Sequence, residues 1–596
     1  MFVELRAHTA YSFGDGVLPP EALAKRARRL GYTHLAVTDS ADLGGLVRFA
    51  QAMRKPLRDE ACADAATHAE LGADACPRCE RPLAPIAGAE LVVDGHPAAF
   101  LARNAQGYRN LAALVTLARV GAWETWQKDR QGDRRGRPQV TWAQVAAHAQ
   151  GLHALTGPAS GMIASRLRAR DDLGAREILR QWREVFDASR LSVEVQLHHV
   201  SGSEAALAGR LITLAEHEGV PWVVAHDPRY VDADGRLAHD VLTANRHGVT
   251  LDEASQQGLL RPNGEWSLIS PRSMLLRWSG RTEGIRESRR IAEECEPLDL
   301  AWMRPPMPVY PPPSLAGDTA VSTHTTNAML RLRTYEGAHE RWGRTLSPQQ
   351  EGQLEKELEL VARLGFGGFF LVMWDAVRFA RSRNILCQGR GSAANSAVAF
   401  CLGITAVDPV KHGLLFERFL SEVRADGAAE PPDIDVDFEH ERREEVLDYM
   451  YDTWGRGHAA ITAVTQQYRA PNAVRDTLRA FGYPLEVADA LAKRLHYADP
   501  AEGAEAIRGE LGKAHGFDAE SSRGAAALRT IAAFDGVARL RSTHVGGFVL
   551  SSAPLGSYLP VEQTSMGRTI LQFDKDDLDD LGVPKFDFLG LGGLTM

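Results

Sequence analysis

The chain has 596 residues, of which 44% are hydrophobic and 24% charged, so it is long enough for several domains with separate cores. Its net charge of −9 argues against a simple basic nucleic-acid-binding domain, although a local basic channel remains compatible with it. The opening MFVELRAHTAYSF lacks the basic and apolar regions of a secretion signal, and no apolar run is long enough for a bilayer, so a cytoplasmic protein is expected.

The first part of the chain alternates strand-like and helix-like patterns. FVELRA, PPEALAKRARRLGY and THLAVTD predict a strand, a helix and a strand. Similar apolar runs return at PIAGAELVV, AAFLAR, GLHALTG, LSVEVQL and PWVVAHD, each followed by a helical pattern. These runs predict a layered or barrel-like α/β domain over 1–275.

Three of the six cysteines gather in one short segment of this domain. Six cysteines are too few for a disulfide framework in so long a chain. Cys76 and Cys79 have the spacing of a zinc knuckle, and Cys62 and His68 could complete four ligands. The alternative is an alanine-rich loop whose thiols are incidental, and the sequence leaves both interpretations open.

The second half of the chain begins after a composition change. Residues 303–320 contain six prolines, which favour extended chain, so 276–320 is expected to be a connector. Long helices, a glycine-rich segment and a short strand then predict a domain over 321–465. A helix-rich span follows over 466–540, and strand-like segments around GGFVLSS, TILQFD and PKFDFLG occupy 541–596.

The segment CQGRGSAANS places two glycines and Arg390 directly before the apolar helical pattern SAVAFCLGI. Helix N-termini offer unpaired N–H groups, and glycine lets a phosphate approach the backbone, so a phosphate site is expected here. Side chains of Arg390, Ser392 and Asn395 could add contacts. The chain has no GxxxxGK[ST] motif, so this is not a Walker loop, and a glycine-rich connector is the alternative.

Carboxylates alternate with apolar residues in PPDIDVDFEHERREE. A strand has a period of two, so Asp433, Asp435 and Asp437 share one face of a strand while Ile434 and Val436 face a core. VPKFDFLGL repeats this pattern, with Lys585 and Asp587 on one face. If the two strands pair, Asp587 meets the first acids. Like charges held together repel unless cations neutralise them, so the pattern predicts two Mg²⁺ ions.

The same acids also match part of a calcium-binding loop. Asp433, Asp435, Asp437 and Glu444 occupy positions 1, 3, 5 and 12 of an EF-hand pattern. Phe438 stands where the sharp turn of that loop requires glycine, and the β-branched neighbours favour a strand. The calcium interpretation is therefore disfavoured.

At ILCQGRGSAANSAVAFCLGITAVDP, LLFERFL, PPDIDVDF and PKFDFLGL the chain resembles the bacterial C-family DNA polymerases, the DNA polymerase III alpha subunits. QGRGSAANS, THVGGFVLS and DKDDLDDLG resemble the error-prone, damage-tolerant branch, with the replicative branch as the alternative. The resemblance implies an α/β multidomain protein: an N-terminal PHP-type (β/α) barrel, then a polymerase-beta-like nucleotidyltransferase palm with an inserted helical thumb.

The resemblance also implies the residues of a polymerase site. Asp433, Asp435 and Asp587 would be catalytic and hold magnesium, and Asp437 would be a supporting acid. The incoming triphosphate would be contacted by Arg390, Gly391, Ser392 and Lys585. Thumb side chains would follow the DNA backbone, although a solvated helix face is the alternative for the arginines: Tyr468, Arg469, Arg475 and Arg479.

The N-terminal domain departs from the PHP metal-binding pattern. Arg6 and His8 stand where the family has a His-x-His pair, and Arg229 ends the motif that begins at Asp227. The expected ligands that remain are His8, Asp15, Glu90 and Asp227. A guanidinium removes a ligand and adds a permanent charge, so Arg6 and Arg229 could occupy the place of the cation. No metal-dependent nuclease activity is expected.

The sequence ends at GLGGLTM, where the family continues into fingers, a clamp-binding region and an oligonucleotide-binding domain. The expectation is a fragment or a truncated product whose own catalysis is poor. Expected partners are primer-template DNA and deoxynucleoside triphosphates, with the sliding clamp and other mutagenesis or replisome proteins contacted through the missing region. The alternatives are a replicative alpha subunit and an inactive fragment that binds DNA or proteins; a PHP-type phosphoesterase is disfavoured.

Overall fold

The computed structural model describes residues 1–55, 82–128, 138–312, 315, 321–420, 432, 434–564 and 566–591. The chain forms two compact units. The first unit is Met1–Trp302 with Thr465–Arg541, and the second is Met303–Val464 with Ser542–Met596. Each unit is therefore built from segments that are discontinuous in sequence.

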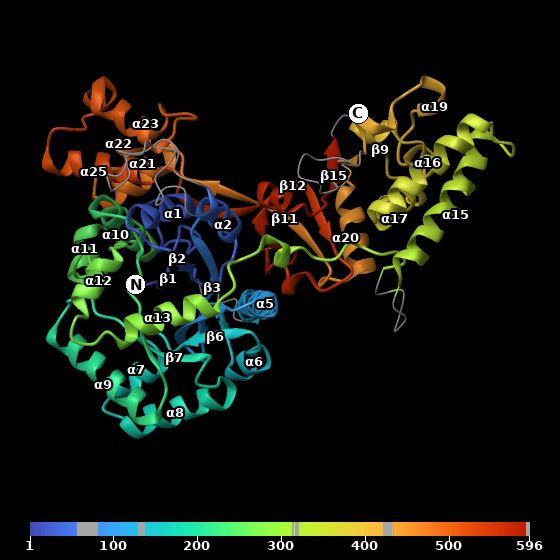
Figure 1. Ribbon diagram of the computed structural model, residues 1–596. Coiled ribbons are helices and arrows are strands. Elements are labelled where there is room, and N and C mark those ends of the chain that lie inside the picture. Colours follow the sequence, from blue (N-terminus) through green and yellow to red (C-terminus); the bar gives the residue numbers. More distant parts are fainter. Residues whose placement is uncertain are drawn as a thin grey trace, which may run out of the picture. The chain divides into compact units, whose positions relative to one another are not determined.

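The first unit contains an eight-stranded sheet that curls into a half barrel (Figure 1). The strands are parallel except that β4 runs antiparallel to both β3 and β6. The expected α/β domain is confirmed. In sheet order the strands are β1 (Glu4–Ala7), β2 (His34–Val37), β3 (Ala84–Val93), β4 (His96–Ala102), β6 (Leu152–Leu155), β7 (Leu191–Val195) and β8 (Trp222–Val224), with β5 (Gln139–Val140) paired to β3.

Helices pack around this sheet, and the strands are apolar because these helices bury their side chains. β1, β6, β7 and β8 are buried at every residue, as in sheets that are covered on both faces. The helices are α1 (Pro20–Arg29), α2 (Leu46–Arg54), α5 (Ala105–Lys128), α6 (Trp142–Ala147), α7 (Met162–Arg168), α8 (Asp172–Val185), α9 (Gly202–Glu218), α10 (Ala233–His247), α11 (Leu251–Gln256), α12 (Pro271–Arg277) and α13 (Glu283–Glu294).

Helix α13 extends the first unit past the expected boundary at residue 275. It packs on β8 and β1, and a Cβ on Gly284 would lie 2.3 Å from the Trp222 ring, so only glycine allows this approach. Its buried residues include Ile285 and Ile291. The first unit therefore runs to Trp302, within the short helix η2 (Leu300–Met303).

The helical segment expected to be a thumb belongs to the first unit. Its helices share a hydrophobic core with α10, and Asn245 Nδ2 donates to the carbonyl of Asp476 (3.0 Å). Arg541, at the end of the segment, makes two bonds to the buried Asp42 (2.8 and 2.9 Å). The elements are α21 (Ala470–Ala480), α22 (Leu485–Ala492), α23 (Pro500–Ala506), η5 (Ile507–Leu511), α24 (Gly512–Ala514) and α25 (Ser522–Ala533).

The second unit contains a seven-stranded mixed sheet. β10 and β15 are parallel neighbours, and β9 and β12 flank them in antiparallel pairs. In sheet order the strands are β13 (Val561–Gln563), β14 (Thr569–Asp574), β11 (Ala459–Gln467), β12 (Ala538–Leu550), β15 (Phe586–Leu591), β10 (Asp435–Glu439) and β9 (Cys387–Arg390). Strands β11 and β12 each run from one unit into the other.

Helices of the second unit bury the apolar face of this sheet. The ring of Phe369 in α17 stacks on Phe586 of β15 (centroids 4.4 Å apart), and Phe438 of β10 packs edge-on against Phe588 (5.7 Å). The helices are α15 (Thr323–Trp342), α16 (Pro348–Leu364), α17 (Gly367–Ser382), η3 (Gly391–Asn395), α18 (Ala397–Cys401), α19 (Pro409–His412), η4 (Phe416–Arg418), α20 (Arg443–Trp454), η6 (Leu555–Ser557) and α26 (Lys575–Leu581).

A helix that spans a membrane needs about twenty consecutive, mostly apolar residues. Within the described ranges, no single helix is long and apolar enough to cross a bilayer; only α16 and α17 taken together reach that length, and they are bent by 113°.

Candidate active site

Two acidic residues lie side by side on adjacent strands of the second sheet. Asp435 of β10 and Asp587 of β15 are register partners in a parallel pair. Their neighbours Val436, Phe586 and Phe588 are fully buried, whereas Asp435 keeps 22% of its side-chain surface exposed. The predicted pairing of these two strands is confirmed, and it gives the sheet one apolar face and one face with carboxylates.

Arg390 lies on the other side of Asp435. It is the register partner of Asp435 on β9, and its Nε is 3.3 Å from Asp437 Oδ1. Its Nη2 lies 4.0 Å from Asp435 Oδ2. The guanidinium is half exposed, so it neutralises the acids of β10 and still reaches solvent.

The chain turns sharply after Arg390. Gly391 has φ +70°, which L side chains rarely adopt, and a Cβ there would lie 3.6 Å from Asp435 Oδ2. The turn leads into η3, where Asn395 Nδ2 donates to the carbonyl of Ser392 (2.9 Å). Gly391 and Ser392 therefore follow directly on the strand that borders the acids.

A protein carboxylate caps the helix after this loop. The N-terminal N–H groups of Ala397 and Val398 in α18 donate to the carboxylate of Glu357 (2.9 and 3.0 Å). Glu357 is fully buried, so this helix end is already satisfied by a protein carboxylate. A carboxylate distant in sequence thus occupies this helix end, and the preceding turn is the part of the segment left for a phosphate. The expected phosphate site stays a prediction.

Lys585 precedes β15 by one residue. Its ammonium forms an ion pair with Asp579 of α26, and its Nζ lies 3.4 Å from the carbonyl of Lys575. In this arrangement Lys585 is engaged with α26, so a contact with a triphosphate requires the side chain to exchange Asp579 for the phosphate.

A histidine that sequence reasoning missed contacts the register partner of Asp587. His544 Nδ1 accepts the N–H of Gly547 (2.7 Å), and Gly547 is the register partner of Asp587 on β12. Burial, followed by the positive charges of Lys575 and Lys585, lowers the pKa of His544. The sequence signal that could have identified His544 is its place before two glycines in THVGGFVLS, a segment that also carries the family resemblance.

The donor set at this site suits a hard divalent cation. Asp435 and Asp587 present carboxylate oxygens from adjacent strands, and Mg²⁺ prefers oxygen ligands of this kind. Asp433, the third expected ligand, lies outside the described residues. Among the residues that the structure does describe, no group of three histidine, cysteine, aspartate or glutamate side chains is arranged to hold an ion.

The first unit holds a second cluster of acids, which we call the N-terminal acid cluster: Asp15, Glu90, Glu194 and Asp227. Arg6 is fully buried within it, with Nη1 2.8 Å from Glu194 Oε2 and Nη2 paired with Glu90. Glu194 was not among the expected residues. It lies on β7 inside LSVEVQL, where only the curl of the sheet brings it to Arg6.

Arg229 supplies a second positive charge to the N-terminal acid cluster. It forms ion pairs with Asp15 and with Asp227 (3.1 Å). Burial alone would raise the pKa of Asp15, but Arg229 and His239 lower it well below its usual range. His8 lies 3.3 Å from Asp227, and burial together with Arg229 lowers its pKa to about 4. Two buried arginines are therefore paired with the acids of the cluster, and His8 lies beside them as a neutral imidazole.

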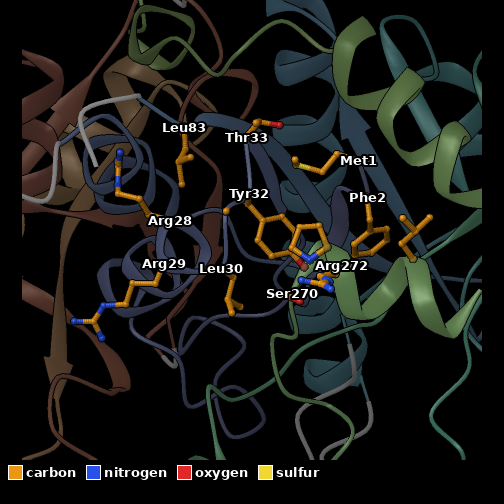
Figure 2. Close-up of a pocket in the computed structure, with 13 residues that line it drawn as sticks. Met1, Phe2, Arg28, Arg29, Leu30, Tyr32, Thr33, Leu83, Ser270 and Arg272 are labelled. Atoms are coloured by element: carbon orange, nitrogen blue, oxygen red, sulfur yellow. The ribbon is translucent and has the colours of Figure 1, made fainter. Parts of the chain in front are cut away.

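Two of the cavities in the first unit differ in whether expected site residues line them. One, of about 560 Å³, is lined by Glu90, Glu194 and Asp227 together with Arg229 and other residues, and it opens onto the N-terminal acid cluster. The other, of about 810 Å³, is lined by Phe2, Tyr32, Leu83, three arginines and other residues, with Tyr32 near its centre (Figure 2). The second cavity contains none of the expected site residues.

The expected DNA contacts of the helical segment are only partly accessible. Tyr468 is 6% exposed, bonds to Asp476 (3.0 Å) and packs on Phe534, so it is a core residue, which corrects the expectation. Arg469 and Arg475 form ion pairs with Asp499 and Asp489, and Arg479 is exposed.

The proposed zinc ligands Cys62, His68, Cys76 and Cys79 lie outside the described residues. Within the described ranges, the cysteines are unbonded thiols at positions 295, 387 and 401.

Comparison with known families agrees with this architecture. Residues 328–590 match the bacterial DNA polymerase III alpha NTPase domain, and residues 4–198 match the PHP domain. This combination defines the class of protein that the chain resembles: a PHP domain is followed by a region similar to the bacterial DNA polymerase III alpha NTPase domain.

Curated relatives that match the chain over its whole length include error-prone DNA polymerases. Those of Anaeromyxobacter dehalogenans (strain 2CP-C), Pseudomonas aeruginosa and Mycobacterium tuberculosis (strain H37Rv) are each 37% identical to it. The alignments cover 100% of this chain and 54%, 51% and 49% of the respective relatives. The chain thus spans about half the length of the curated relatives it matches. Among solved structures, an amidohydrolase from Chromobacterium violaceum matches 38% of this chain and 88% of its own with 15% identity and a TM-score of 0.21.

Proposed function

We propose that this chain carries the catalytic core of a DNA-directed DNA polymerase of the error-prone type. The reaction joins a deoxynucleoside monophosphate to the 3′-hydroxyl of a primer and releases pyrophosphate. The observation that carries the proposal is the register pairing of Asp435 with Asp587, since metal-dependent nucleotidyl transfer needs carboxylates from separate segments at one point. The family match and the names of the full-length relatives support the same activity.

The metal ligands would be Asp433, Asp435 and Asp587, holding two Mg²⁺ ions. When bound, such ions lower the pKa of the attacking hydroxyl and stabilise charge on the leaving group. The two pairing strands fix Asp435 and Asp587 relative to each other, so the protein does not have to reorganise them when substrate arrives.

The triphosphate would be bound by Arg390, Gly391, Ser392 and Lys585. Arg390 is half exposed and within reach of two carboxylates, so it can exchange Asp437 for a phosphate oxygen at little cost. The positive φ of Gly391 opens the backbone beside Asp435, where a side chain would otherwise stand between the acids and the loop.

The N-terminal acid cluster is proposed to be structural and not to support a metal-dependent nuclease. Arg6 and Arg229 already compensate its carboxylates, and His8 is its one remaining imidazole of the expected ligand set. A divalent cation would have to replace a guanidinium at these carboxylates. The displaced guanidinium would stay buried close to the ion without its carboxylate partner, which is unfavourable.

Further proposals concern residues and partners beyond this site. Zinc bound by Cys62, His68, Cys76 and Cys79 is proposed, and metal analysis of the reduced protein tests it: less than one zinc per chain would reject it.

The substrates would be primer-template DNA and deoxynucleoside triphosphates in the cytoplasm. The sliding clamp and other mutagenesis or replisome proteins are proposed partners of the natural full-length protein.

Primer extension on intact and damaged templates tests the proposed polymerase function. The longest natural form of the polypeptide should extend a primer with Mg²⁺, and an Asp435→Asn variant should not. Extension past a damaged base would support the error-prone type, whereas arrest at the lesion would favour a replicative alpha subunit. DNA binding with no extension on either template would indicate a binding module instead.

A further inference from the structure

Glu357 is a buried carboxylate that lies outside the proposed catalytic groups. It belongs to α16 and is fully buried. It accepts hydrogen bonds from Ser396 Oγ (2.7 Å), from the N–H groups of Ala397 and Val398, and from Gln353 Nε2 (2.7 Å). Both carboxylate oxygens are thus engaged, which is the arrangement that compensates a buried negative charge.

The segment that Glu357 holds is the end of the glycine-rich turn. Ser396 donates to Glu357, accepts the N–H of Ala399 (3.0 Å), and its own N–H donates to the carbonyl of Ala393 in η3 (3.1 Å). Ser396 therefore joins the turn, the helix after it and Glu357 in one network.

The beginning of the turn is fixed independently. Arg390 is held by its register pairing with Asp435 on β10. Gly391–Asn395 thus lie between two anchors, the strand pair at one end and Glu357 at the other. At the distal end, Glu357 adds hydrogen bonds to the burial of Ala393 and Ala397 in the core.

We propose that Glu357 is a positioning residue for nucleotide binding: it holds the Gly391–Asn395 turn against β10 so that Arg390, Gly391 and Ser392 present one preorganised surface to the triphosphate. This inference rests on the proposed polymerase function. It assigns Glu357 an indirect role, because the carboxylate is buried and bonds only to protein groups.

The chemistry of the anchor explains why a glutamate is needed. Every partner of Glu357 donates, so a group that only accepts fits all of them. In Glu357→Gln one oxygen becomes an NH₂ donor that faces another donor. The volume of the side chain stays the same, so the substitution loosens the anchor without opening a cavity.

The test measures equilibrium binding of a deoxynucleoside triphosphate and single-nucleotide insertion in the longest natural form of the polypeptide. Glu357→Gln should raise the Kd and the KM for the nucleotide about tenfold, the size expected for losing a hydrogen bond to a charged group. The kcat and the Kd for primer-template DNA should stay within about twofold of the parent. Glu355→Gln is the matched control, since Glu355 lies on the same helix and pairs with Arg331 at the surface.

The outcomes separate the inference from the proposed function. A fall in kcat or thermal stability at unchanged nucleotide Kd and KM would show that Glu357 is merely structural and would overturn the inference while leaving the polymerase intact. A parent protein that neither binds nor incorporates nucleotide would overturn both. If Glu357→Gln does not fold, Ser396→Ala decides the question, because it removes the hydroxyl that donates to Glu357 and accepts the N–H of Ala399 and keeps the other bonds of Glu357. A higher nucleotide KM supports the inference, and an unchanged KM rejects it.

Discussion

Asp435 and Asp587 occupy one register position on two parallel strands, although the helical segment and several strands separate them in the chain. Arg390 completes the row on the antiparallel neighbour of Asp435. Three charged side chains from three strands therefore meet in one line across the sheet. The apolar residues that alternate with them are buried against α17, so the line cannot slip by one residue without placing charges in the core.

Removal of either paired acid should abolish nucleotide insertion. Asp435→Asn and Asp587→Asn each should reduce kcat/KM at least about 10²–10³-fold, because an amide binds a divalent cation poorly and stabilises less charge in the transition state. Asp437→Asn should have a much smaller effect, since Asp437 pairs with Arg390 and lies opposite Leu589. Steady-state insertion assays measure the three variants, and an equal loss in all three would contradict the assignment.

Substitution of Arg6 should lower the free energy of unfolding of the first unit. Arg6→Met leaves Glu194 and Glu90 without their buried partner and should lower the free energy of unfolding by about 3–5 kcal/mol. Arg289→Met removes an exposed pair with Glu293 and should cost at most about 0.5 kcal/mol. Urea unfolding monitored by circular dichroism compares them, and a neutral Arg6→Met variant would argue against a structural cluster.

Divalent cations should not activate a nuclease in the N-terminal acid cluster. We expect no manganese-stimulated exonuclease activity on single-stranded or mispaired DNA, because Arg6 and Arg229 occupy the carboxylates that would bind the ion. The measurement is release of nucleotides from a labelled 3′ end. Activity that requires Mn²⁺ and disappears in His8→Ala would show that the cluster does bind a catalytic metal.

Glu4 should make the stability of the first unit depend on pH. Burial, opposed by the N–H groups of Arg6 and His226 and assisted by the charges of Asp227 and Glu194, raises the pKa of Glu4 from 4.5 to about 8. A folded pKa above the unfolded one gives stability that is fully present below about 4.5 and is lost as the pH rises toward 8.

The Glu4→Gln variant removes this titration. Relative to the parent, its free energy of unfolding should therefore improve as the pH rises from about 5 to about 8, by up to about 1.4 kcal/mol for each pH unit. Unfolding midpoints at several pH values provide the measurement. A difference between variant and parent that stays constant over this range would exclude the raised pKa.

Arg479 should contribute to DNA binding more than Tyr468. Arg479 is exposed, so Arg479→Ala should weaken binding of primer-template DNA and reduce its dependence on salt by about one released counterion. Tyr468→Phe removes a buried hydrogen bond to Asp476 and should cost about 1 kcal/mol of stability without changing DNA affinity. Fluorescence anisotropy over a range of salt concentrations measures the DNA affinity of both variants. An equal loss of DNA affinity in Arg479→Ala and Tyr468→Phe would indicate that Tyr468 does contact DNA.

The sequence by itself determined the local features of this protein. The period of two in DIDVDF and KFDFLG predicted two strands with acids on one face, and their pairing is confirmed. The replacement of histidines by Arg6 and Arg229 was visible once the sequence was set against the PHP pattern that it resembles. These features could be predicted because strand periodicity and side-chain chemistry are properties of neighbouring residues.

Only the tertiary structure decided which distant groups meet. Glu357 covers the end of α18 and leaves no place there for a phosphate, Glu194 joins Arg6 across the curled sheet, and the core of the first unit encloses Tyr468. His544 gains its position from the pairing of β12 with β15. Each of these contacts joins segments that are far apart in the chain, so it depends on how sheets and helices pack and leaves no local periodicity in the residues themselves.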